Sequence, residues 1–168
     1  MNIHSLVPDE VHFGFDLAPM INDSLQRAAL MVASKKEALK ALIEANSSAP
    51  EQLEVLIALY KFYFYQGEIE QAEDLVFQTL IKASLQGGFS HKWETLTIES
   101  TDWNTLRGPE RIYLYSLKAL AFIRLRQEDL RNAESILDVL EQLDPNDQVG
   151  AEVIRSLLYA IQEENVHD

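Results

Sequence analysis

The stretch LEVLIALYKFYFYQGEIEQAEDLVFQTLIKASLQ, residues 53–86, decides the fold. Apolar side chains recur in it at helical spacing, as at Leu53, Leu56 and Ile57, and this period favours amphipathic helices over strands. Gly67 interrupts the pattern near its middle, where a glycine is typical of a helix end. The stretch therefore predicts two helices joined by a short turn.

Helix boundaries elsewhere follow from capping and breaking residues. Ser48 with Glu51 forms a capping-box pattern and predicts the start of the helix that Gly67 ends. Gly108 followed by Pro109 predicts the start of another helix. The remaining expected helices span residues 68–84, 129–143 and 151–164, the helix after Pro109 runs to about residue 126, and only residues 95–98 suit a strand.

The helical segments repeat with a period of 34 residues. Three units follow this period, Pro19–Gln52, Leu53–Gln86 and Leu114–Asp147. An insertion, residues 87–113, separates the second unit from the third, and a final helix within residues 148–164 follows the third. Each unit has a small residue at the same place in its second helix, where close helix packing needs one: Ala38, Ala72 and Ala133.

In its period and in positions such as Leu56, Tyr63, Gly67 and Ala72, the chain resembles the tetratricopeptide repeat family. The resemblance implies an all-α, right-handed superhelix of about three helical hairpins with a C-terminal capping helix. This single domain covers residues 19–165, and residues 1–18 form an N-terminal segment whose mobility is left open. Tyr60 stands where the family has a small residue, so we expect it either to push its helices apart or to turn outward.

A second resemblance is to small bacterial proteins of this repeat class that are encoded beside nitrogen-fixation genes. Three segments carry it: IALYKFYFYQGEIEQAEDL at residues 57–75, IYLYSLKALAFIRLR at residues 112–126 and LDPNDQVGA at residues 143–151. The resemblance implies a helper role around an assembling enzyme.

Composition excludes several classes of protein. The chain has 168 residues with 14 Lys and Arg against 27 Asp and Glu, a formal net charge of −13. Nucleic acid and anionic membranes attract basic surfaces, so neither is an expected partner. The chain has no Cys and no segment approaching the roughly 20 apolar residues of a membrane helix, which favours a cytoplasmic location.

Catalytic and metal-binding patterns are weak. His91 and Glu94 could share a helix face as a ligand or acid–base pair, but no second cluster completes a metal site. The favoured interpretation is an exposed loop histidine, and His4 and His12 in the N-terminal segment offer no better site. We expect no enzyme, no metal and no cofactor.

The first helix of each family unit lines a concave groove, so the resemblance implies a set of groove residues here. In this set, basic side chains alternate with aromatic ones on an acidic protein. A bound peptide could bury its apolar side chains on these aromatic rings while its carboxylates pair with the basic side chains. The alternative is that these residues bind nothing and are ordinary surface cations lying over aromatic side chains of the core. The expected groove residues are Arg27, Ile57, Lys61, Phe64, Tyr65, Tyr115, Lys118, Phe122, Arg126 and Tyr159.

These patterns predict a non-catalytic adaptor or chaperone-like module that binds a peptide segment of another protein in the groove. The alternative is a structural module for homo-oligomerisation. The family's carboxylate clamp for chaperone tails is not expected, because Asp23 and Arg27 replace its Lys and Asn. The aromatics of the insertion, Phe89, Trp93 and Trp103, either form a second binding surface or fold back onto the repeats.

Overall fold

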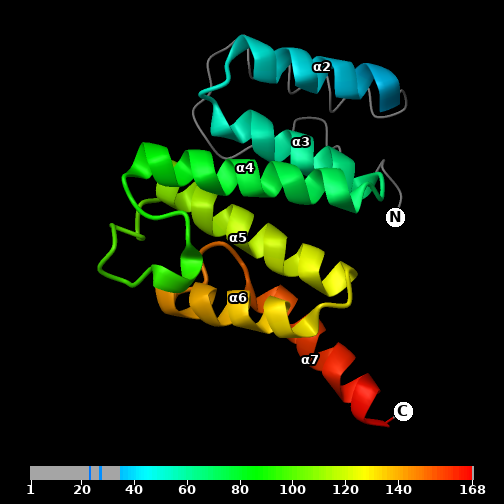
Figure 1. Ribbon diagram of the computed structural model, residues 1–168, viewed down its shortest axis with the longest axis vertical. Coiled ribbons are helices and arrows are strands. Elements are labelled where there is room, and N and C mark those ends of the chain that lie inside the picture. The colour runs from blue at the N-terminus through cyan, green and yellow to red at the C-terminus, as the bar shows by residue number, and fades with distance from the viewer. Residues whose placement is uncertain (1–22, 24–26, 28–34, 168) are drawn as a thin grey trace. The chain divides into compact units, whose positions relative to one another are not determined.

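The computed structural model describes Asp23, Arg27 and residues 35–167, and every regular element in residues 35–167 is helical (Figure 1). The chain divides into two compact units, one ending at Thr79 and one beginning at Leu80, so the boundary falls inside a helix. Within the described residues no helix is long and apolar enough to cross a membrane. The elements are α2 (Lys35–Ser48), α3 (Leu53–Tyr65), α4 (Ile69–Gly87), the 3-10 helix η2 (Trp93–Thr95), α5 (Pro109–Arg126), α6 (Leu130–Leu143) and α7 (Glu152–His167).

Several sequence-based expectations lie outside the described residues. They are the N-terminal segment 1–18 with His4 and His12, and most of the first helix of the unit Pro19–Gln52. Of that helix the structure describes Asp23 and Arg27.

The first unit contains the hairpin of α2 and α3, which run antiparallel and pack together (Figure 1). On α2 the buried residues recur at helical spacing, and on α3 burial extends almost around its first two turns. Burying these side chains is the main stabilising contribution to the hairpin. The buried residues are Ala38, Ala41, Leu42 and Ala45 on α2 and Leu53, Val55, Leu56, Ile57, Ala58, Leu59 and Tyr60 on α3.

The structure decides two local expectations in this unit. Ser48 is the last residue of α2, and α3 begins at Leu53 with Gln52 at its N-cap, so the predicted capping box does not form. The helix α2 continues past its last buried residue, Ala45, to Ser48 and leaves only a short turn before α3. Tyr60 is 2% exposed, so of the two outcomes expected for this residue the outward turn is excluded.

The turn after α3 recurs after α5, 61 residues later, which is one 34-residue period plus the 27-residue insertion. Gly67 and Glu128 occupy the same place, with φ angles of 81° and 61°. The next amide donates a hydrogen bond back into the preceding helix in both turns, from Glu68 to the carbonyl of Tyr63 at 2.9 Å and from Asp129 to Arg124 at 2.8 Å. The repeat seen in the sequence is therefore a repeat of backbone geometry.

Substitutions in these equivalent turns should have opposite effects. We expect Gly67→Ala to lower the free energy of unfolding by about 1 kcal/mol, because a side chain disfavours the left-handed region. A Cβ there would meet no described atom within 4 Å, so backbone conformation alone carries the cost. Glu128→Gly should raise that free energy by about 0.5 kcal/mol, since relief of the left-handed conformation exceeds the added chain entropy. Urea denaturation followed by circular dichroism measures both free energies of unfolding. If the two substitutions changed stability in the same direction, the two turns would not be equivalent.

The second unit contains the antiparallel hairpin of α5 and α6, with α7 packed against both (Figure 1). Ala133 on α6 is fully buried, as its predicted role in close helix approach requires. Asp129 caps α6 by accepting a hydrogen bond from the amide of Asn132, and its pKa is lowered mainly by the Asn132 side chain. The largest fully buried side chains of α5 and α6 are Tyr113, Leu114, Leu117, Leu120, Ile123, Ile136, Leu137 and Leu140.

The insertion folds back onto α5 through three aromatic rings that pack against one another. Phe89 lies 5.1 Å from Trp103 and 5.0 Å from Tyr113 between ring centroids, both edge to face. The Trp103 indole donates to the carbonyl of Thr97 at 2.9 Å, and the Tyr113 hydroxyl donates to the carbonyl of His91 at 2.8 Å. The expected return of Phe89 and Trp103 to the repeats is therefore confirmed within this unit.

The remainder of the insertion is less buried. Trp93 is half-buried in η2, and residues 95–98 form no strand within the described part of the insertion. A Cβ at Gly87, at the end of α4, would collide with the Phe89 ring, so a larger residue there would displace that ring. The insertion is thus an ordered structure built on α5 rather than an open loop.

Candidate functional site

The accessible face of α5 carries four of the expected groove residues. Tyr115, Lys118 and Phe122 are half-buried and Arg126 is exposed, whereas most other residues of the helix are buried. Their spacing of three to four residues aligns them along one side of the helix. The sequence pattern therefore placed these four residues on one face, as expected.

Lys118 has a structural role that the sequence does not show. Its ammonium lies 4.7 Å from the centroid of the Tyr115 ring, within cation–π range. The same ammonium donates a hydrogen bond to the carbonyl of Val149 at 2.7 Å. Lys118 keeps its positive charge at the surface, but it also ties α5 to the segment before α7.

Arg111 is a second cation of this face that sequence reasoning missed. Its guanidinium donates to the carbonyl of Gln148 at 2.6 Å, next to the carbonyl that Lys118 holds. Arg111 lies three positions before the third repeat unit begins, and the groove residues were predicted from positions within the units, so Arg111 was not among them. Together the two cations position the segment between α6 and α7.

Asp144 completes the support of that segment from inside. The carboxylate is 8% exposed and accepts hydrogen bonds from the amides of Gln148 and Val149, each at 3.0 Å. Asp147 then accepts from the amides of Ala151 and Glu152 at the start of α7. Charged side chains therefore bind the amide and the carbonyl of both Gln148 and Val149, which helps to set the direction of α7.

Tyr159 lies on α7 and is 52% exposed. It neighbours Arg155, which is 9% exposed and pairs with Asp138 at 3.0 Å and Glu141 at 3.2 Å on α6. Burial alone lowers the pKa of the Arg155 guanidinium, but Asp138, with smaller contributions from Tyr159 and Glu141, outweighs it and raises that pKa. Arg155 is thus a fixed cation between α6 and α7.

The first unit carries the other expected groove residues. On α3, Lys61 and Phe64 are half-buried and Tyr65 is 37% exposed, and the Phe64 and Tyr65 rings lie 5.8 Å apart. Ile57 is 5% exposed, so it belongs to the core more than to an accessible surface. Arg27 is exposed and lies 3.9 Å from the Asp23 carboxylate, one helical turn away.

The expected groove residues divide between the two units: Lys61, Phe64 and Tyr65 share α3, and four others share α5, whereas Arg27 and Tyr159 lie on neither helix. Lys61 and Phe64 on α3, and Phe122 and Arg126 on α5, also take part in interactions within the chain. A ligand of either set would therefore meet cations and rings already positioned by the protein.

Titratable groups elsewhere offer less. His91 and Glu94 are both exposed, and within the described residues no three side chains of His, Asp or Glu are grouped as a metal ion would need. Burial raises the pKa of the Tyr113 hydroxyl, with a further contribution from Glu94. Burial also raises the pKa of Glu54 on α3. Both pKa shifts follow from burial, and neither group forms a catalytic pair with another of the described side chains.

Comparison with known proteins gives one informative match. No protein-family model and no solved structure matches the chain. The chain is similar to the uncharacterized 19.8 kDa protein in the nifW 5' region of Azotobacter chroococcum mcd 1, with 27% identity over 154 residues, 89% of this chain and 85% of that protein. This match supports the resemblance to proteins encoded beside nitrogen-fixation genes, whereas the tetratricopeptide resemblance stays a prediction.

Proposed function

We propose that this protein is a non-catalytic interaction module, an adaptor or chaperone-like protein that binds a peptide segment of a partner. The observation that carries the proposal is the accessible face of α5, where Tyr115 and Phe122 alternate with Lys118 and Arg126. Rings supply apolar contact area, and the cations attract carboxylates of an acidic peptide more strongly where the surface is partly dry.

The proposal includes a right-handed superhelix of the tetratricopeptide kind. Its support is the equivalent backbone turn at Gly67 and Glu128, together with the fully buried Ala72 and Ala133 five residues further on. Arrays of this kind present the first helix of each repeat unit to a ligand. In the predicted units Leu53–Gln86 and Leu114–Asp147 those helices are α3 and α5. They carry Lys61, Phe64 and Tyr65 on the first compact unit and the four residues above on the second.

The proposed setting is a cytoplasmic helper role around an assembling enzyme. The Azotobacter relative is described by its place in the nifW 5' region. The similarity to proteins encoded beside nitrogen-fixation genes is the reason for proposing such a role. The absence of Cys and the net charge of −13 agree with a cytoplasmic protein that binds neither nucleic acid nor membrane.

The alternative proposal is homo-oligomerisation, favoured by the exposure of Tyr65 and Tyr159. Light scattering separates the two proposals. A monomer at all concentrations supports the adaptor, whereas a dimer that loses its stability when both tyrosines are changed to serine supports self-assembly.

The adaptor proposal predicts that Lys61→Glu combined with Arg126→Glu weakens partner capture by about tenfold or more, because attraction becomes repulsion at two places. Lys118 is left intact because its change would also release Val149. Capture from native lysate, quantified by mass spectrometry, measures the effect.

The matched control for that experiment is Lys40→Glu combined with Lys92→Glu. It makes the same change in net charge at exposed positions on α2 and in the insertion. Circular dichroism must show that both double variants fold. Equal capture by the two variants would contradict the proposed surface.

A further inference from the structure

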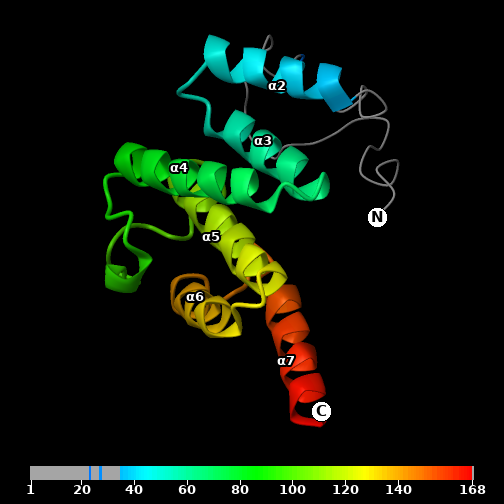
Figure 2. The same cartoon turned by 45° about the vertical axis from the view of Figure 1, so that its right-hand side comes forward.

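The outer side of α7 presents an apolar surface that no described element covers. Ile154, Arg155 and Leu158 are the buried residues of this helix. On the opposite side, Val153 is 66% exposed and Leu157 is 42% exposed. In both views the C-terminal half of α7 projects beyond α5 and α6 (Figures 1 and 2). A helix that only solvated the end of the array would carry polar residues on this side.

The exposed apolar residues form one continuous stripe. Val153, Leu157 and Ala160 follow one another at intervals of four and three residues, so they lie along one face of α7. We call these three residues the α7 stripe. Its width suits the apolar face of another amphipathic helix, whose apolar residues recur at the same helical spacing.

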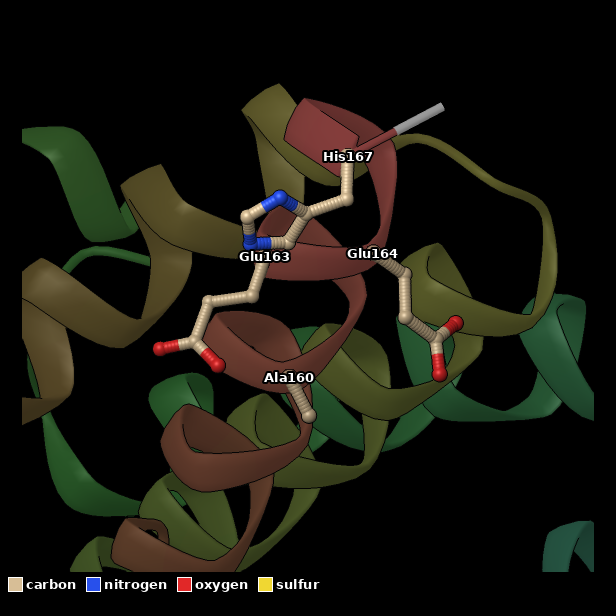
Figure 3. A pocket seen from close by; sticks show the side chains of 4 residues that line it. All are labelled: Ala160, Glu163, Glu164 and His167. Carbon is tan, nitrogen blue, oxygen red and sulfur yellow. The ribbon is translucent and has the colours of Figure 1, made fainter.

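The α7 stripe ends in a shallow hollow lined by Ala160, Glu163, Glu164 and His167 (Figure 3). Glu163 and Glu164 follow Ala160 by three and four residues, so their side chains border it on both sides, as Figure 3 shows. The small Ala160 leaves space between the two carboxylates. A long basic side chain could lay its methylene groups on Ala160 and place its charge between Glu163 and Glu164.

Charge decides which occupant suits the α7 stripe. The exposed charged side chains along α7 are Glu152, Glu163 and Glu164, while its one Arg, Arg155, is held by Asp138 and Glu141 on α6. A second copy of this chain would bring the same carboxylates to the contact and be repelled. A basic helix would instead be attracted and steered toward the surface.

We propose that the α7 stripe and its hollow form a docking surface for a basic amphipathic helix of a partner protein. Apolar residues of that helix pack on Val153 and Leu157, and a Lys or Arg enters the hollow beside Ala160. This surface uses none of the residues of the α5 face, so its test is independent of the test of the peptide-binding proposal.

The test is a binding titration of the full chain with a synthetic amphipathic helix of leucine and lysine, labelled for fluorescence anisotropy. We expect binding that weakens with salt. Glu163→Gln combined with Glu164→Gln should weaken binding about fivefold, because it removes the ion pairs with the peptide. Leu157→Ser should weaken binding about tenfold, because it removes an apolar contact. A peptide with glutamate in place of lysine should not bind.

The matched control is Glu70→Gln with Asp74→Asn, two exposed acids of α4 outside this surface. It changes the net charge equally and should leave binding unchanged, with circular dichroism confirming the fold of every variant. Equal weakening by the control, or absence of binding to the lysine peptide, would overturn the proposal. A dimer in sedimentation that Leu157→Ser dissociates would also overturn it, because the occupant would then be a second copy.

Discussion

Replacing Trp103 by alanine is expected to lower the free energy of unfolding of the second unit by about 3 kcal/mol, the lower end for a buried tryptophan. The indole is 3% exposed and contacts the rings of Phe89 and Tyr113. Its removal leaves a cavity between the insertion and α5. The lower end applies because Thr97, which loses the indole hydrogen bond, is exposed and can bond water instead.

Urea denaturation followed by circular dichroism measures this loss, and hydrogen exchange locates it. Exchange should rise most in the insertion and at the start of α5. Leu106→Ala is the control in the same segment, since Leu106 is 74% exposed and its change should stay within about 0.5 kcal/mol. If Trp103→Ala costs no more than Leu106→Ala, the insertion is not held by its aromatic rings.

Replacing Asp144 by alanine is expected to cost about 2 kcal/mol, because two backbone amides lose a charged acceptor in a buried place. Each carboxylate oxygen accepts one of these bonds, from Gln148 or from Val149. Asp144→Asn should lower the free energy of unfolding by less than Asp144→Ala does, but by more than half of that amount. It keeps one acceptor oxygen and turns an amide group toward the other N–H.

The Asp144 variants should also change the dynamics of α7, because the segment they loosen sets the direction of that helix. Hydrogen exchange in residues 148–158 is expected to increase while α5 and the start of α6 keep their protection. Asn146→Ala, at an exposed position of the same turn, should leave stability and exchange unchanged. Unaltered exchange in Asp144→Ala would mean that Arg111 and Lys118 suffice to hold the segment.

Much of the helical architecture could be predicted from local sequence. Gly67 and the pair Gly108–Pro109 mark helix boundaries that the structure reproduces, since these residues act on the backbone within a few positions. Ser48 misled the prediction because its capping pattern does not decide where the helix before it ends, and α2 continues past its last buried residue, Ala45, to Ser48. The helix-spaced pattern also put Tyr115, Lys118, Phe122 and Arg126 on one side of α5.

Local sequence patterns were enough to predict most helices, the 34-residue period and the common face of the α5 residues, because these follow from backbone preferences and from burial along one helix. The contacts of Lys118 and Arg111 with the carbonyls of Val149 and Gln148, and the packing of Phe89 and Trp103 on Tyr113, are visible only in the folded structure. It also left the α7 stripe exposed. The physical reason is that each of these contacts joins residues at least ten positions apart, and the spacing of residues along a chain does not specify which distant groups will meet.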